Sequence, residues 1–338
     1  MMMKALVMEE PKKAVIKEVP YPKPGKNEIT VKVKACGICG TDIHIYNGTF
    51  MPNYPLIPGH EFSGVVHEIG EGVTQFNIGD RVAVDPSLFC GKCDYCLSGR
   101  GNHCVEWKAT GDTENGAMAE YVRVPENTVF RMPNEMPYSE GAFIEPVACV
   151  VHGMNQLDLK VGQSVLLFGA GSMGQLLIQA LTHAGAGELA VVDVAQNKLD
   201  LARKNGATHT YLTKDVPTQL ANRNKHNGFD IVVDATGIPS VIESEYQYLA
   251  PKGTHLQFGV APEGTTIQIS PFDIYHMDWK LVGSMAVNHT FKAAMNWMAA
   301  KRFNTEQLIS EVIKLDEVPE FFAKGKAPDI MKVQISFD

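Results

Sequence analysis

The sequence lacks the features typical of secreted, membrane-spanning and nucleic-acid-binding proteins. Its N-terminal segment, MMMKALVMEEPKK, has no apolar stretch of signal-peptide length. No uninterrupted apolar run of about 18 residues occurs in the chain. There is no long basic run either, and the net charge of -8 would on average repel a nucleic-acid backbone. We therefore expect a cytoplasmic protein that binds neither membranes nor nucleic acid.

Cysteine is present in an odd number, seven, which fits poorly with a fully paired disulfide framework. Four of the seven lie in CGKCDYCLSGRGNHC, with the spacing C-x2-C-x2-C-x7-C. Four thiolates can surround a tetrahedral Zn²⁺ and leave no coordination position for a substrate. The alternatives are an iron–sulfur cluster, because thiolate spacing alone does not fix the metal, and four unligated thiols. The sequence predicts a structural zinc lobe at about residues 88–106, with the ligands Cys90, Cys93, Cys96 and Cys104.

The chain changes character near its middle. Up to about residue 124, short β-branched runs such as EITVKVKACG and FSGVVHEIG stand between turn residues, which is typical of an all-β unit. From about residue 145, apolar runs alternate with helical periodicity, which predicts a parallel sheet covered on both faces. The tail IMKVQISF is too short for a domain, and we expect it to fold back onto the first one. The fold class is thus α/β with two domains, residues 1–147 with 286–338, and residues 148–285.

A second set of metal-binding residue types precedes the cysteine lobe, in CGICGTDIH and PGHEFSG. Thiolate, imidazole and carboxylate together suit zinc, and three protein ligands with a fourth position open form the catalytic arrangement. Any one of these residues alone is more often a packed core residue. Their combination indicates a second metal site, with candidates Cys36, Cys39, Thr41, Asp42, His44, His60 and Glu61.

The stretch LLFGAGSMG predicts a dinucleotide site. Gly169, Gly171 and Gly174 form G-x-G-x-x-G directly after an apolar strand and at the start of a helix. They allow the tight turn, the approach of the backbone to the pyrophosphate and close helix–strand packing. Asp193 ends the next apolar run, about 20 residues further on, where a carboxylate binds the ribose hydroxyls and repels a 2′-phosphate. This favours NAD over NADP.

Together with GAMAEYV, EPVACVVHG and VIKLDEVPEFF, these motifs make the chain resemble the zinc-dependent medium-chain alcohol dehydrogenase family along essentially its whole length. The HE pair and the IEP at Ile144–Pro146 are most similar to the branch of polyol (sorbitol-type) and threonine dehydrogenases. The resemblance implies a GroES-like β-barrel catalytic domain and a Rossmann domain with a doubly wound parallel sheet.

The resemblance also implies roles for single residues. The catalytic zinc would be bound by Cys39, His60 and Glu61, and Cys36 would be a neighbour rather than a ligand. Glu145 would lie beside the open position, on the metal or on its water. Thr41 and His44 would carry the proton to water, and Asp42 would orient the site without reacting. The implied cofactor-binding residues are Gly169, Gly171, Met173, Gly174, Asp193, Lys198, Val260 and Ser284.

An open zinc position beside a nicotinamide predicts hydride transfer. The resemblance of the Glu145–Pro146 pair to the polyol branch implies that the hydride passes from a secondary hydroxyl of a polyol or sugar alcohol to NAD, giving a ketone. One alternative is oxidation of an amino alcohol in the manner of threonine 3-dehydrogenase, which CGTDIHIYN resembles. Another is a non-enzymatic NAD- or zinc-binding protein of the same fold. Relatives acting on sorbitol carry an Arg–Tyr pair where this chain has Ala286 and Val287, which argues against sorbitol itself. The family is usually dimeric or tetrameric, so we expect a homo-oligomer.

Overall fold

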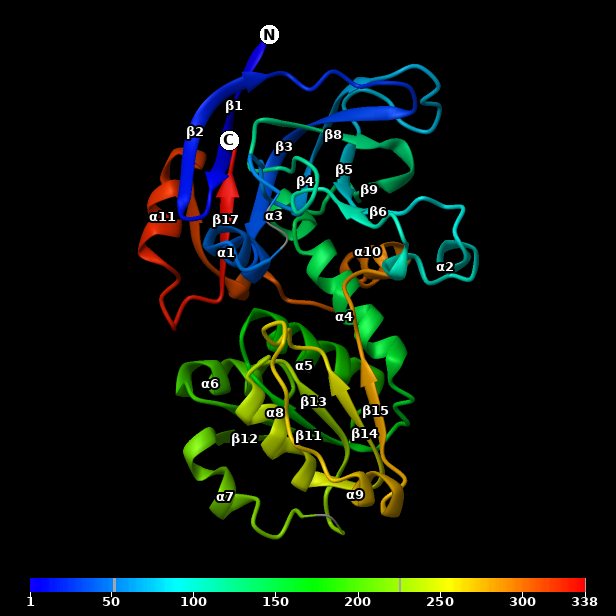
Figure 1. Ribbon diagram of the computed structural model, residues 1–338, viewed down its shortest axis with the longest axis vertical. Helices are drawn as coiled ribbons and strands as arrows, with labels where there is room; N and C mark the ends of the chain where they lie inside the picture. Colours follow the sequence, from blue (N-terminus) through cyan, green and yellow to red (C-terminus); the bar gives the residue numbers. More distant parts are fainter. Residues whose placement is uncertain (51–52, 225, 338) are drawn as a thin grey trace. The chain divides into compact units, whose positions relative to one another are not determined.

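A computed structural model describes residues 1–50, 53–224 and 226–337 of the chain. The chain divides into two compact units (Figure 1). Unit 1 consists of Met1–Ala148 and Val287–Asp338, and unit 2 of Cys149–Ala286. Among the described residues, no helix is both long enough and apolar enough to cross a membrane.

Unit 1 is built on β-sheets. A seven-stranded sheet has the order β16-β17-β3-β4-β5-β9, with β8 also paired to β3, and β1 and β2 form a separate hairpin. These strands are β1 Met2–Glu10, β2 Lys13–Pro20, β3 Glu28–Ile38, β4 Glu61–Ile69, β5 Arg81–Val84, β8 Tyr121–Pro125, β9 Val129–Arg131, β16 Ile309–Ile313 and β17 Lys332–Ser336. The helices of this unit are α1 Gly40–Asn47, α3 Tyr138–Gly141, α10 Phe291–Ala299 and α11 Val318–Lys324, and α4 Ile144–Gln156 crosses the boundary between the units.

The long strand β3 organises the core of unit 1. It pairs antiparallel with β4, β8 and the C-terminal strand β17. Its alternate residues Ile29, Val31 and Val33 are fully buried and join Phe62 of β4 in one apolar cluster. Each large apolar side chain buried in this way contributes about 1.5–3 kcal/mol. The pairing of β17 with β3 places Gln334 and Glu61, the first residue of β4, opposite the same residue of β3, Gly37.

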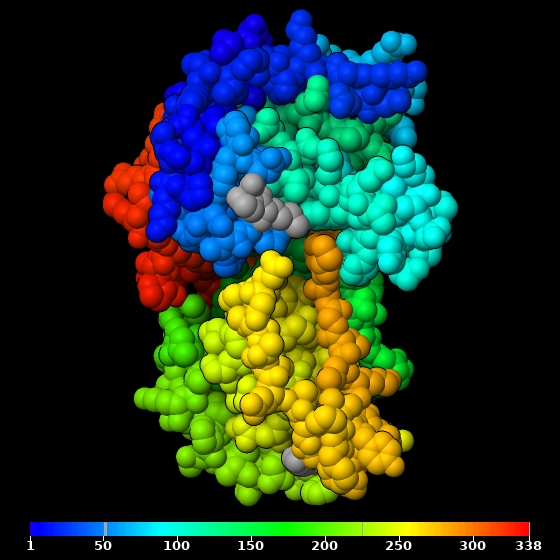
Figure 2. All heavy atoms as spheres, in the orientation of Figure 1, coloured from blue at the N-terminus to red at the C-terminus, as the bar shows by residue number. Residues whose placement is uncertain are grey.

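The cysteine-rich segment forms a surface lobe with little apolar core of its own. It contains the two-stranded ribbon β6 Ser87–Leu88 and β7 Lys108–Ala109, and the short helix α2 Asp94–Leu97. No residue of α2 is buried. In Figure 2 this segment is the cyan group of atoms that projects at the right of unit 1. A lobe with so few buried side chains needs another source of stability.

Unit 2 contains a six-stranded parallel sheet with the order β12-β11-β10-β13-β14-β15. In chain order this is 3-2-1-4-5-6, the order of dinucleotide-binding folds, with the reversal between β10 and β13. Strands β11 to β15 of this sheet are labelled in Figure 1. The strands are β10 Ser164–Phe168, β11 Glu188–Asp193, β12 His209–Leu212, β13 Phe229–Asp234, β14 Leu249–Gln257 and β15 Lys280–Gly283. The helices are α5 Ser172–Ala184, α6 Gln196–Lys204, α7 Val216–Gln219, α8 Pro239–Glu245 and α9 Pro271–His276.

Candidate functional site

The four cysteines of the lobe converge on one point. Their sulfur atoms all lie within 4.8 Å of one another. The Sγ of Cys96 is 3.9 Å from that of Cys90 and 3.5 Å from that of Cys93. Thiolates placed tetrahedrally around zinc at about 2.3 Å stand about 3.8 Å apart, so the cluster fits the ion. Backbone N–H groups of Cys96 and Val105 lower the pKa of the Cys93 thiol to about 6, whereas burial raises the pKa of the neighbouring Cys96 thiol to about 12, so Cys93 is the more readily ionised of the two.

A second group forms where helix α1 and strand β4 begin. One ligand atom each from Cys39, His60 and Glu61 lies within 4.8 Å of the others. Cys39 is the N-cap of α1, and His60 and Glu61 lie at the start of β4, where Glu61 pairs with Gly37 of β3. His60 and Glu61 are buried. Thus the thiolate, imidazole and carboxylate predicted from separate motifs are brought together in unit 1.

The carboxylate of Glu61 has a buried partner that the sequence did not suggest. Lys332 of β17 donates from Nζ to both Glu61 oxygens at 2.7 Å, and both side chains are almost fully buried. Burial lowers the pKa of Lys332, but the charge of Glu61 outweighs it and the pKa is raised overall. The ammonium group therefore stays charged and balances the carboxylate of Glu61 in the protein interior.

Two carboxylates lie near the ring nitrogen Nδ1 of His60. Its Nδ1 lies 3.0 Å from Oδ1 of Asp112 and 3.8 Å from Oδ1 of Asp42. Burial lowers the pKa of His60 in the metal-free protein, whereas Asp112 and then Asp42 raise it, and the net shift is upward. Asp42 also accepts a hydrogen bond from Cys39 N at 2.7 Å. With Nδ1 facing carboxylates, Nε2 is the atom available to a metal.

Of the other residues expected in this region, Thr41 lies near the metal group and the remaining two lie further out. The Cys39 Sγ to Thr41 Oγ1 distance is 3.8 Å. His44, one turn along α1, is exposed, and its Nδ1 is 3.4 Å from Thr49 Oγ1. Glu145, in the first turn of α4, is buried but outside the group of three ligands. Its charge nevertheless acts on Lys332.

The glycine-rich turn of unit 2 has the geometry its spacing predicts. Gly169 has φ +95°, which favours glycine, and a Cβ on Gly174 would stand 2.0 Å from Gly169 O. A Cβ on Gly171 would meet nothing within 4 Å, so the backbone there is open to a ligand. Gly171 is the N-cap of α5, and Met173 lies half-buried in its first turn. The free N–H groups at this helix start can bind a phosphate.

Asp193 lies directly beside the glycine turn. Its carboxylate accepts hydrogen bonds from Ala170 N at 2.7 Å and from Ala195 N at 2.9 Å. Lys198 lies half-buried on α6. Its carbonyl accepts a hydrogen bond from Gln175, a fully buried residue of α5 that also donates to Ala170 O. Gln175 thus joins the turn to α6, and its position inside an apolar helix face was the only signal in the sequence.

The last two expected cofactor residues follow strands at the same edge of the sheet. Val260, after β14, is 79% exposed, and its backbone approaches Gly237 so closely that a Cβ there would stand 2.3 Å from Val260 O. Ser284 directly follows β15 and donates from its backbone N to Gln257 O at 3.2 Å. Its Oγ is buried and has no hydrogen-bond partner within the described part of the chain. Such an atom is available to a ligand.

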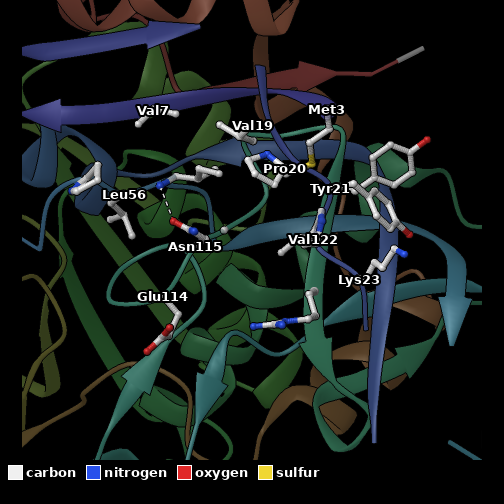
Figure 3. Close-up of a pocket in the computed structure, with 16 residues that line it drawn as sticks. Met3, Val7, Val19, Pro20, Tyr21, Lys23, Leu56, Glu114, Asn115 and Val122 are labelled. Atoms are coloured by element: carbon white, nitrogen blue, oxygen red, sulfur yellow. Dashed lines mark hydrogen bonds between the residues drawn. The ribbon is translucent and has the colours of Figure 1, made fainter. Parts of the chain in front are cut away.

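A cavity of about 760 Å³ in unit 1 lies elsewhere (Figure 3). Met3 and Val19 of the β1–β2 hairpin line it together with Asn115, whose Oδ1 accepts a hydrogen bond from Ile57 N at 3.0 Å. None of its lining residues belongs to either metal group. Ligand chemistry, rather than cavity size, identifies the candidate site here.

Comparison with known proteins identifies the family of the chain. Residues 25–134 match the family described as alcohol dehydrogenase GroES-like domain, and residues 172–300 match zinc-binding dehydrogenase. The chain is 34% identical to D-arabinitol dehydrogenase 1 of Uromyces fabae, over 98% of this chain and 97% of that protein. It is 35% identical to D-altritol 5-dehydrogenase of Agrobacterium fabrum, over 99% of both.

Comparison with solved structures shows that the similarity includes the fold. A zinc-binding dehydrogenase from Sinorhizobium meliloti, bound to NADP, superposes with a TM-score of 0.95 and 33% identity over 99% of both chains. An Escherichia coli alcohol dehydrogenase, complexed with NADH, superposes with a TM-score of 0.93 and 26% identity over 99% of both chains. The predicted fold class, a GroES-like domain with a Rossmann domain, is confirmed.

Proposed function

We propose that this chain, which belongs to the zinc-dependent medium-chain alcohol dehydrogenase family, oxidises a secondary hydroxyl of a polyol to a ketone and transfers the hydride to NAD. The convergence of Cys39, His60 and Glu61 carries the proposal. Three such ligands leave a fourth tetrahedral position for a substrate oxygen. When bound there, zinc would lower the pKa of the alcohol and stabilise the alkoxide.

The residues around the metal group supply the proton route. The Thr41 hydroxyl, close to the Cys39 sulfur, can accept the substrate proton and donate its own. His44 lies three residues further along α1 and is exposed, so it can release a proton to water. The buried Glu61 carboxylate is paired with the Lys332 ammonium group, which balances its negative charge beside the metal group. Glu145 would lie beside the substrate oxygen or beside a water molecule on the metal.

The cofactor preference rests on Asp193. Its buried carboxylate is held by two backbone N–H groups and keeps lone pairs for the ribose hydroxyls, whereas a 2′-phosphate there would meet a negative charge. The Sinorhizobium meliloti relative was solved with NADP, so the preference needs a direct test in this chain. We expect NAD to give the higher kcat/KM.

A substrate panel tests the proposed reaction. Purified protein is supplied with NAD or NADP and with D-arabinitol, D-altritol, sorbitol or L-threonine, and the reduced cofactor is followed by absorbance. We expect turnover of at least one polyol with NAD, and little of L-threonine. His60→Ala should lower kcat/KM by about 10³-fold or more, because the metal supplies several kcal/mol of charge stabilisation.

His67→Ala is the matched control, since His67 lies on strand β4, which follows His60 directly, but is exposed. It should retain the activity of the unaltered protein. Oxidation of L-threonine alone would favour the amino-alcohol alternative. Full activity after complete removal of metal would contradict the proposal, and absence of turnover with every alcohol would favour a non-enzymatic role.

The polyol dehydrogenase is further proposed to act in the cytoplasm as a homo-oligomer, a dimer or a tetramer. Support for assembly comes from the outer strand of unit 2. Leu281 of β15 and Met285 beyond it are exposed, as are Phe272 and Tyr275 of α9. Large apolar side chains beside an unpaired strand edge are typical of a protein interface.

A further inference from the structure

His60 is held from one side by the loop from Gly111 to Ala117, of which the sequence motifs include only the end, at the start of GAMAEYV. The segment from Ile57 to His60 forms hydrogen bonds with the chain after Asn115: Gly116 N donates to Ile57 O at 2.7 Å, and Ala117 N donates to Gly59 O at 2.9 Å. A Cβ on Gly116 would stand only 2.4 Å from Gly59 O. The two segments therefore lie in close backbone contact.

Asp112 lies at the tip of this loop. The preceding Gly111 has φ +92°, and a Cβ on it would stand 2.4 Å from Gly59 O and 2.9 Å from His60 N. Glycine is thus required for the loop to approach His60. Backbone hydrogen bonds from Asp112 and Glu114 to Ala109 O close the turn. The Asp112 carboxylate consequently has a fixed position against the imidazole.

The two carboxylates near His60 are not equivalent. Oδ1 of Asp112 is 3.0 Å from His60 Nδ1, whereas that of Asp42 is 3.8 Å away. Asp42 already accepts from the backbone N of Cys39, and it holds that ligand at the start of α1. Asp112 Oδ1 and His60 Nδ1 are both buried, and their contact falls short of hydrogen-bond geometry. Neither atom has a hydrogen-bond partner among the residues that the structure describes.

We propose that Asp112 is the positioning residue that accepts the Nδ1–H of His60 and so presents Nε2 to the metal. A histidine ligand of zinc normally donates its other ring N–H to a carboxylate or carbonyl, which fixes the tautomer and the ring orientation. A small rotation of the imidazole would complete the contact with Asp112. Asp42 then positions Cys39 and Asp112 positions His60, so each of these two zinc ligands has its own carboxylate. The inference rests on the proposed zinc site but not on the identity of the substrate.

The test measures metal affinity rather than turnover. Zinc affinity is determined by competition with a chelator for the unaltered protein and for Asp112→Asn, Asp42→Asn and Asp85→Asn. Loss of an outer carboxylate weakens zinc binding by about 10–100-fold. We expect Asp112→Asn to weaken the binding of one zinc ion per chain, the one bound by His60. The zinc ion of the four-cysteine lobe should bind as before and serves as an internal reference.

Asp85→Asn is the matched control, because Asp85 is a buried carboxylate of unit 1 that accepts from Ser87 N and does not contact His60. It should bind both zinc ions normally. Asp42→Asn keeps an oxygen for Cys39 N and should weaken binding less than Asp112→Asn. In a His60→Ala background, Asp112→Asn should change the zinc affinity no further, a coupling that a purely structural role would not produce.

Unchanged zinc affinity in Asp112→Asn, or a greater loss in Asp42→Asn, would overturn the inference. If Asp112→Asn does not fold, Asp112→Glu keeps the charge and displaces the carboxylate, and the same drop in affinity is expected of it. The measurements also distinguish failure of this inference from failure of the proposed polyol oxidation. Weakened zinc binding in a protein that oxidises no polyol would leave the role of Asp112 intact, and polyol oxidation with unaffected zinc binding would refute only that role.

Discussion

At the scale of single residues, the least expected feature is a lysine in the interior of unit 1. Lys332 is 3% exposed, and its ammonium group contacts both oxygens of Glu61, itself 1% exposed. Removing one partner of a buried ion pair leaves an unpaired charge in a medium of low dielectric constant, which is far more costly than losing an exposed pair. The pair therefore matters for stability as well as for the metal group.

Replacing Lys332 with Met should destabilise the metal-free protein by about 3–5 kcal/mol, because Glu61 keeps its charge or must take up a proton in the interior. Urea unfolding of metal-free protein measures the loss. Added zinc should reduce the difference, since a bound cation supplies a new partner for Glu61. The control Lys4→Met removes the exposed contact with Asp316 and should leave the unfolding midpoint unchanged. Equal midpoints for Lys332→Met and the unaltered protein would contradict the prediction.

The residues that could be predicted from sequence are those whose spacing is set by local backbone geometry. Cys39 caps a helix, His60 and Glu61 are adjacent, and the glycines of the dinucleotide turn lie within one strand–turn–helix. Lys332 and Asp112 could not be found in this way. Lys332 is 271 positions from Glu61, and only the pairing of β17 with β3 brings them together.

At the scale of secondary-structure elements, helix α8 and strand β14 share a buried polar contact that the proposed chemistry does not use. His255 Nε2 lies 2.8 Å from Oε2 of Glu245, and both side chains are almost fully buried. Burial and the nearby Asp234 raise the pKa of Glu245 to about 9, and burial lowers the pKa of His255 to about 4. Tyr246 stacks on the imidazole at 4.5 Å. At neutral pH the contact is a hydrogen bond between two uncharged groups.

This contact predicts that stability falls toward alkaline pH. Between pH 4.5 and about 9 folded Glu245 holds a proton that the unfolded chain has released, so unfolding becomes easier as the pH rises. His255 opposes this only between about pH 4 and 6.5, where the unfolded histidine binds the extra proton. Above pH 6.5 the free energy of unfolding should therefore fall by up to about 1.4 kcal/mol per pH unit until about pH 9.

Glu245→Gln, which cannot ionise, should reduce that slope by up to about 1.4 kcal/mol per pH unit in urea unfolding measured from pH 6.5 to 9. The raised pKa of His60 in the metal-free protein adds a slope of the same sign, which should remain in the variant. Glu243→Gln, an exposed position on the same helix, should retain it. A slope as steep in Glu245→Gln as in the unaltered protein would assign the pH dependence to another group. The apolar runs of β10, β11 and β13 could be recognised from the sequence, but this contact could not, because it depends on which face of β14 meets α8.

At the scale of the whole molecule, the order of the parallel strands follows from the alternation of strands and helices along the chain. The sheet of unit 2 then ends in β12 on one side and β15 on the other. An edge strand exposes unpaired backbone groups, and proteins usually protect it with charge or by covering it. In β15 the exposed residues include Leu281 as well as Lys280, so this edge is only partly protected. The sequence did not show that β15 is an exposed edge strand, because its apolar residues are equally typical of a buried strand.

The proposed homo-oligomer predicts that two β15 strands related by a twofold axis pair their free backbone groups and cover Leu281, Phe272 and Tyr275, which are 43%, 66% and 81% exposed. Sedimentation equilibrium should then give two or four times the chain mass of 37.0 kDa. Leu281→Lys would bring like charges together across the axis and should shift the mass toward 37.0 kDa. Val312→Lys on β16, an exposed apolar residue of the edge strand in unit 1, should leave the mass unchanged. An unaltered protein that sediments at 37.0 kDa would contradict assembly, and dissociation by Val312→Lys alone would place the interface on unit 1.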